Sequence, residues 1–148
     1  MEDGESLQRH FQAMSLPPDA ARFLLVVYEA WQVFDDFADG DPVKREDLNA
    51  TLWNVFVGLP SNPFYQAHSQ SLIPALGTGI LKWIASDAAE RAGQADEVSF
   101  VWRAGFYDLV MLVAQLALGP AEAMRQAPSV MKLYGEKFAD YRKEFSDA

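Results

Sequence analysis

The stretch PPDAARFLLVVYEAWQVFDDFADG, residues 17–40, decides the fold. Proline is tolerated in the first turn of a helix, and glycine is typical just after the last turn. The stretch therefore predicts one long helix from Pro17-Pro18 to Asp39. At about 100° per residue, the large apolar side chains fall on one half of that helix and most of the charged ones on the other. The predicted buried face contains Phe23, Val26, Val27, Ala30, Trp31, Val33, Phe34 and Phe37.

Helix signals continue on both sides of this stretch. Proline, glycine and capping residues recur, and no alternating strand pattern of useful length is present. The further helices are expected over about Ser6–Met14, Asp41–Val57, Asn62–Arg91, Asp96–Leu118 and from Gly119-Pro120 to the C-terminus, with breaks at Gly58–Pro60 and Pro128 and a possible split at Pro74. The sequence therefore predicts an all-α fold, a compact bundle of about six helices in a single domain over residues 1–148.

Composition excludes several kinds of site. The chain has 148 residues, which is about one domain, and no cysteine, so disulfides, thiolate catalysis and Cys-ligated metals are ruled out. Its two histidines, His10 and His68, are too few for a His-rich metal site. No G-x-S-x-G turn, P-loop or glycine-rich dinucleotide loop is present.

The charge argues against direct nucleic-acid binding. Acidic side chains number 21 and basic ones 12, for a net charge of -9. Residues 1–97 hold 15 of the acidic and 6 of the basic side chains, whereas residues 98–128 and 129–148 are each neutral. We interpret this split as two faces of one domain.

No membrane association is expected. The N-terminal residues are acidic where an export signal needs basic ones. The apolar run from Val98 to Leu118 is long enough to span a bilayer, but it contains Arg103, Asp108 and Gln115. A buried helix of a soluble, cytoplasmic protein is the prediction.

Asp35, Asp36 and Asp39 form an acidic corner in the last turn of the long helix. Carboxylates there face the negative end of the helix dipole, so a cation, Lys44 and Arg45, or a basic partner would compensate them. Two aspartates three residues apart suit Mg²⁺ or Ca²⁺. The corner resembles the DDxxD motif of helical prenyltransferases and terpene synthases, but the chain is too short and a second motif is not evident. That family is rejected, and Asp41 is assigned as the cap of the next helix.

Asp108 is predicted to be a buried polar residue, because apolar residues surround it in the sequence. Arg103 points elsewhere on the helix, so the partner must come from another segment. The candidates are Arg22, His68, Lys82, a tyrosine hydroxyl or a bound ion. Asp108 then either fixes helix register or serves as a catalytic carboxylate. A similarity to all-α nucleotide pyrophosphatases would join it with Glu29, Asp36 and Glu97, although the paired acidic motifs of that family are not recognisable.

The C-terminal segment carries an apolar seam with spacings of three and four. In one interpretation the seam docks on the protein's own core. In the other, residues 129–148 protrude and the seam binds a partner protein or a second subunit. The candidate partner-binding residues are Met131, Tyr134, Phe138, Tyr141 and Phe145.

Three stretches together resemble small all-helical proteins of tailed bacteriophages and prophages: Asp35–Asp41, Trp53–Tyr65 and Trp102–Asp108. The resemblance implies no activity and no catalytic residues. If the protein is phage-encoded, it is expected in the cytoplasm of the host cell or in the virion.

The sequence thus favours a non-enzymatic protein-binding or assembly factor without a cofactor. It would be a virion component or an inhibitor of a host protein, including a DNA mimic. The alternative is a Mg²⁺-dependent all-α hydrolase of phosphorylated small molecules that uses the Asp35–Asp41 cluster.

Overall fold

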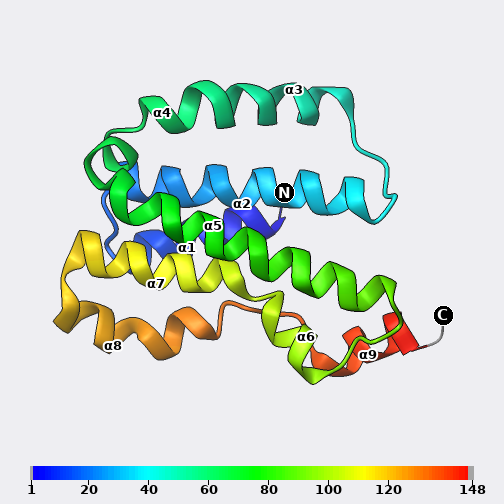
Figure 1. Ribbon diagram of the computed structural model, residues 1–148. Helices are drawn as coiled ribbons and strands as arrows, with labels where there is room; N and C mark the ends of the chain where they lie inside the picture. Colours follow the sequence, from blue (N-terminus) through cyan, green and yellow to red (C-terminus); the bar gives the residue numbers. More distant parts are fainter. Residues whose placement is uncertain (1, 147–148) are drawn as a thin grey trace. The chain divides into compact units, whose positions relative to one another are not determined.

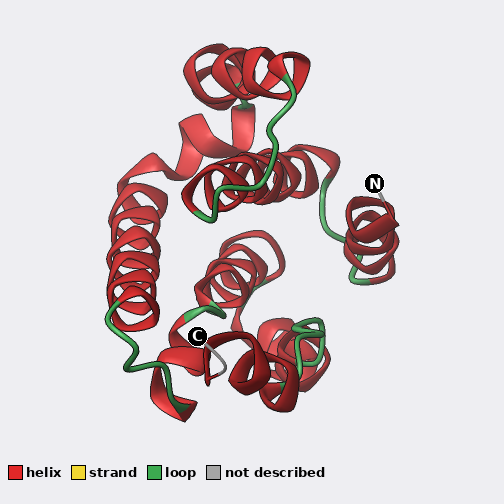
Figure 2. Ribbon diagram, turned by 90° about the vertical axis from the view of Figure 1, so that its right-hand side faces the viewer, coloured by secondary structure: helices red, strands yellow, loops and turns green. Residues whose placement is uncertain are grey.

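The computed structural model describes residues 2–146, which contain helices joined by turns and no strand (Figures 1 and 2). The prediction of an all-α fold is confirmed. The chain divides into two compact units, Met1–Ser69 and Gln70–Ala148. A single domain over the whole chain stays a prediction.

Unit 1 is organised around α2. Helix α1 packs against α2, and α3 with the π-helical turn η1 runs antiparallel along it (Figure 1). The elements of this unit are α1 (Glu2–Ala13), α2 (Pro18–Ala38), α3 (Arg45–Trp53), η1 (Asn54–Gly58), α4 (Leu59–Ser61) and the start of α5 (Pro63–Arg91).

The long helix forms as expected. Helix α2 begins at Pro18 and ends at Ala38. Two residues later, Gly40 has a φ of 77°, which favours glycine. Phe23 is fully buried, and its ring lies 6.2 Å from that of Phe64. The expected apolar face is therefore the core face over the first two thirds of α2, while Phe34 and Phe37 near its end are exposed.

Two predicted boundaries in unit 1 are wrong. Asp41 does not cap α3, which starts at Arg45. This later start places Glu46 and Asp47 in the first turn, where the helix dipole favours them. Gly58–Pro60 does not break the helix, because the helical turn just before Pro60 is the wider π-helical turn η1. In a regular α-helical turn, the proline ring would clash with a backbone carbonyl of the preceding turn.

The cap at Asn62 is confirmed. Its side-chain oxygen accepts the Tyr65 N–H at 2.9 Å, and its amide donates to the Asp19 carbonyl at 3.0 Å. One side chain therefore starts α5 and ties it to the first turn of α2. The helical geometry of α5 is interrupted at His68, with φ -123° and ψ 17°, and not at Pro74.

Unit 2 contains the rest of α5 and four later helices. They are α6 (Glu97–Trp102), α7 (Gly105–Leu118), α8 (Pro120–Met131) and α9 (Phe138–Ser146). Helix α7 packs against α8, and α6 against α9. The Asp96 side chain caps α6 by accepting the N–H groups of Val98 and Ser99.

The structure has more helical segments than the six expected, because two predicted helices are divided. The run 97–118 turns at Arg103–Ala104, between α6 and α7. The last helix continues through Pro128 to Met131, and residues 132–137 then separate it from α9. The expected break at Pro128 is therefore wrong.

Candidate functional site

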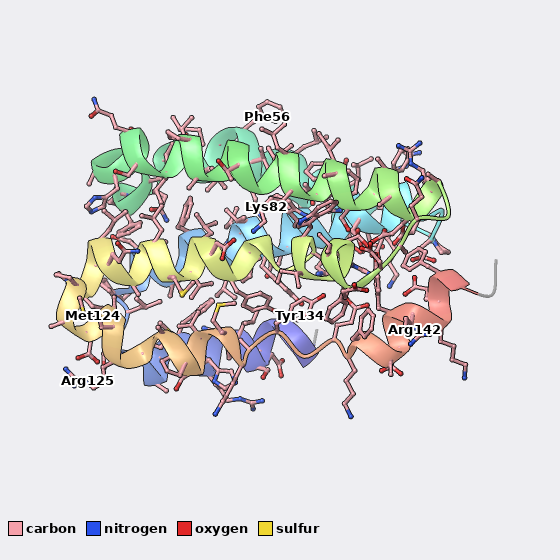
Figure 3. The ribbon with its side chains drawn as sticks, turned by 60° about the horizontal axis from the view of Figure 1, so that its bottom comes forward. Phe56, Lys82, Met124, Arg125, Tyr134 and Arg142 are labelled. Atoms are coloured by element: carbon pink, nitrogen blue, oxygen red, sulfur yellow. The ribbon has the colours of Figure 1, made fainter. Side chains whose placement is uncertain are left out.

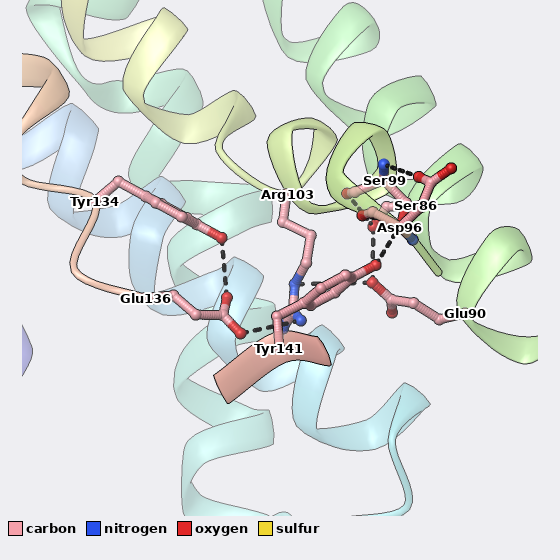
Figure 4. Close-up of polar contacts among 8 residues, drawn as sticks. All are labelled: Ser86, Glu90, Asp96, Ser99, Arg103, Tyr134, Glu136 and Tyr141. Carbon is pink, nitrogen blue, oxygen red and sulfur yellow. Dashed lines mark hydrogen bonds and ion pairs between the residues drawn. The ribbon is translucent and has the colours of Figure 1, made fainter. Parts of the chain in front are cut away.

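The most elaborate polar cluster in unit 2 surrounds Arg103, at the end of α6 (Figure 4). Its side chain is only 21% exposed and lies between Glu136, at 3.2 Å, and Glu90, at 3.9 Å. The buried Nη1 atom contacts Glu136 without hydrogen-bond geometry. The guanidinium also lies over the ring of Tyr141, 5.0 Å from its centroid.

The hydroxyl groups of the cluster are paired within it. The Tyr141 hydroxyl shares a hydrogen bond with Ser99 at 2.5 Å, and the Tyr134 hydroxyl donates to Glu136 at 2.9 Å. Ser86 donates to Glu90 at 2.8 Å. These contacts bring together the end of α5, α6, the 132–137 turn and α9.

The electrostatics of the cluster favour protonated tyrosines. Burial raises the pKa of Tyr134 above its ordinary value of 10.0, and the hydrogen bond to Glu136 and its negative charge raise it further. Burial also raises the pKa of Tyr141. For Arg103, burial alone would lower the pKa, but the acidic groups around it, Glu136 and Glu90 first among them, together outweigh burial and raise the pKa. The cluster is therefore suited to holding the C-terminal segment in place.

The C-terminal seam packs largely on its own unit. Phe100 of α6 contacts the rings of Tyr134, Phe138 and Tyr141, with centroids 5.2–5.5 Å apart. Tyr141 is fully buried and its ring contacts Phe145. Tyr134, Phe138 and Tyr141 therefore pack against α6 within unit 2, and residues 132–137 interrupt the single helix expected in this segment. Binding of a partner by the seam residues stays a prediction. Met131, at the end of α8, is exposed.

Asp108 is not buried. Its carboxylate is 53% exposed and pairs with Lys82 at 2.6 Å, linking α7 to α5. Figure 3 shows Lys82 between these two helices. The prediction of burial is wrong because Asp108 is on the solvent-exposed side of α7, while Leu109 and Val110 face the core. Lys82 was among the expected partners.

The aspartate corner lies at the end of α2 as expected. Asp35 and Asp36 are partly exposed and Asp39 is exposed. Among the described residues, no group of three or more His, Asp or Glu side chains is placed to hold a metal ion.

The outer face of α5 is a candidate site that the sequence analysis did not identify. Gly79, on the inner face, approaches Gly105 of α7 so closely that a Cβ on Gly105 would lie 3.8 Å from its Cα. On the opposite side, large aliphatic side chains are 48–68% exposed. We define the outer face of α5 by Ile73, Gly77, Ile80, Leu81 and Ile84.

The signal for this face was present in the sequence. Its residues recur at intervals of three and four, the spacing that places them on one side of a helix. A helix that is apolar on all sides is usually covered on all sides. On α5, the described residues leave the side with Ile73, Ile80, Leu81 and Ile84 exposed.

Among the residues that the structure describes, one segment, Glu97–Leu118, is long and apolar enough to span a membrane by length and composition. The chain turns within it at Arg103–Ala104, and Arg103 is held there by Glu90 and Glu136. The absence of membrane association stays a prediction.

In comparisons with known proteins, no family model, no curated protein and no solved structure matches the chain. We therefore infer function from the exposed faces of the protein and their chemistry.

Proposed function

We propose that the protein is a non-enzymatic assembly protein whose copies associate through the outer face of α5. The observation that carries this proposal is that face itself. From Ile73 to Ile84 it presents four large aliphatic side chains, each about half exposed or more, and no charged one. Contiguous apolar patches of this kind on a soluble protein commonly mark an interaction site.

A second copy of the chain is the occupant that the charges favour. Unit 1 holds 11 acidic and 4 basic side chains, whereas unit 2 holds 10 and 8. Most of the charge that makes two copies repel each other is therefore in unit 1. Two uncharged faces can meet about a two-fold axis without bringing like charges together, and Gly77 at their centre permits close approach.

The size of the face predicts a reversible association. A stable interface buries about 800 Å² per partner, which is more than one helix face supplies. We therefore expect a concentration-dependent equilibrium between monomer and dimer. The resemblance to phage proteins supports a role within a larger particle, in the host cytoplasm or in the virion.

Sedimentation equilibrium over a wide concentration range tests the proposal. The wild type should shift from monomer to dimer, and Leu81→Glu with Ile84→Glu should remain monomeric. Ser71→Glu introduces a charge at an exposed position on another side of α5 and should behave as the wild type. A wild type that is monomeric throughout, or a double variant that still dimerises, overturns the proposal.

No specific observation favours the alternative Mg²⁺-dependent hydrolase. It would be reopened by a Mg²⁺-induced rise in Tm that Asp36→Asn together with Asp39→Asn abolishes.

A further inference from the structure

A second exposed apolar face lies within unit 1, on the helix that runs along α2 (Figure 1). Helices α3 and α4 and the turn η1 between them follow one another without a break over residues 45–61. Thr51 is the one buried side chain in this range, and Figure 3 shows Phe56 pointing away from the ribbon. We define the α3–η1 face by its large apolar side chains, all 39–73% exposed: Leu48, Leu52, Trp53, Phe56 and Val57.

Helical geometry places these side chains in one stripe. Leu48, Leu52 and Phe56 follow at intervals of four, and Trp53 and Val57 form the adjacent row. A surface helix normally turns such a stripe toward the core and its polar residues toward water. Here the arrangement is reversed, because a threonine is buried and the apolar stripe is exposed. This reversal indicates that the stripe contacts another molecule.

The α3–η1 face and most of the outer face of α5 belong to one uncharged run of sequence. No Asp, Glu, Lys or Arg occurs from Leu48 to Leu81. This run holds eight of the 15 large apolar side chains that are exposed among the described residues. The charges of unit 1, 11 acidic and 4 basic, therefore all lie in residues 1–47. Two copies can meet on the α3–η1 face without opposing acidic side chains, although each copy has a net charge of -9.

We propose that dimers formed through α5 associate further through their α3–η1 faces, each face against the same face of another dimer about a second two-fold axis. This inference rests on the proposed α5 dimer. One helix face is smaller than a stable interface requires, so the second face adds area that α5 does not supply. A dimer carries two α3–η1 faces, so two dimers can form two such contacts at once. Two monomers can form only one, which is why association by this face alone is weak.

The charges beside the face are compatible with this pairing. Arg45 lies on the same side of α3 as Leu52, two turns before it. In an antiparallel pairing centred between Leu52 and Phe56, Arg45 would lie opposite residues 61–63 of the other copy, which carry no charge. Helices that bind lipid surfaces usually carry several Lys or Arg side chains on their polar side. The corresponding side here contains Thr51, which is buried.

Sedimentation velocity at concentrations above the dimer range tests the inference. The wild type should form a species larger than the dimer, and Leu52→Glu with Phe56→Glu should stop at the dimer. Gln8→Glu with Gln12→Glu adds the same charge at exposed positions of α1 and should associate as the wild type does. Because Leu52 and Phe56 are more than half exposed, replacing them should leave the Tm nearly unchanged.

Cross-linking identifies the face directly, because the chain has no native cysteine. Phe56→Cys should form a disulfide between copies only at concentrations where the larger species is present. The same cysteine in the Leu81→Glu, Ile84→Glu variant should not cross-link, since that variant stays monomeric. Gln8→Cys, at an exposed position on α1, is the matched control and should not cross-link at any concentration tested.

The outcomes separate this inference from the proposed α5 dimer. A wild type that stops at the dimer, or a Leu52→Glu, Phe56→Glu variant that still forms the larger species, overturns the inference and leaves the dimer intact. A wild type that is monomeric throughout overturns both. Binding of the wild type to phosphatidylcholine vesicles, abolished by Leu52→Glu with Phe56→Glu, would assign the α3–η1 face to membranes and overturn the inference as well.

Discussion

Arg103 shows at the scale of one residue how this chain uses a buried charge. Taking an ion out of water is costly unless opposite charges and polar groups replace the water. Glu136 and Glu90 supply those charges, and the ring of Tyr141 covers the guanidinium. Local sequence patterns do not predict this cluster, because the three charged residues lie in three separate segments.

Replacing Arg103 should therefore be far more costly than replacing an exposed arginine. Arg103→Met removes the positive charge that faces Glu136 and Glu90, whose side chains are only 28% and 10% exposed, and should lower the free energy of unfolding by about 3 kcal/mol. Arg91→Met breaks an exposed i, i+4 pair with Asp87 and should change it by less than about 0.5 kcal/mol. Urea unfolding measures both, and equal losses would contradict this account of the cluster.

The raised pKa of Tyr134 predicts a loss of stability at high pH. Its pKa is raised in the folded state, so the unfolded chain releases the phenolic proton first as the pH rises. Its contribution to stability is complete below pH 10.0, the ordinary pKa, and is lost progressively as the pH rises from there toward the folded-state pKa. Urea unfolding from about pH 8 to about pH 11 should show a shallower decline for Tyr134→Phe than for the wild type. Parallel declines would argue against this role.

At the scale of elements, the docking of α9 on α6 decides between the two interpretations that the sequence left open for Tyr134, Phe138 and Tyr141. Spacings of three and four predicted a single seam from Met131 to Phe145, but the chain leaves the helix at Lys132 and the aromatic residues pack around Phe100. The amphipathic pattern identified which side chains become buried. It contained no information about whether they are buried within this chain or against a partner.

Phe100 and Val101 are neighbours on α6 with opposite surroundings, which makes them a matched pair. Phe100→Ala removes three ring contacts and should lower the free energy of unfolding by roughly 2–3 kcal/mol. It should also speed tryptic cleavage at Lys132 and Lys137, because α9 loses its support. Val101 is 60% exposed, so Val101→Ala should change neither measurement appreciably. If both variants behave alike, α9 is not held by α6.

Local chemistry predicted several elements well. The start of α5 at Asn62, the helix stop at Gly40 and the extent of α2 depend on neighbouring residues alone. The prediction was wrong where a wider turn accommodated Pro60 and where Asp108 turned outward to reach Lys82. Those outcomes depend on tertiary packing, which a single helical pattern does not encode.

At the scale of the whole molecule, the net charge predicts how salt affects association through α5. Salt screens exposed charges over about 10 Å at 0.1 M. Added NaCl should therefore leave association through α5 unchanged or strengthen it, because it reduces repulsion between copies of net charge -9. Sedimentation at low and high salt checks this, and dimers that dissociate as salt rises would contradict an uncharged interface.

The most direct measurement of the central claim uses the absence of native cysteine. Single cysteines placed in turn at Ile73, Gly77, Ile80 and Ile84 are oxidised and the covalent dimer is quantified on a non-reducing gel. A disulfide requires Cβ atoms about 4 Å apart, so only positions close to a two-fold axis can form one. We predict efficient cross-linking at one or two of these positions and none at Ser71→Cys. Equal cross-linking at all five positions, or none on the outer face of α5, would contradict assembly through this helix.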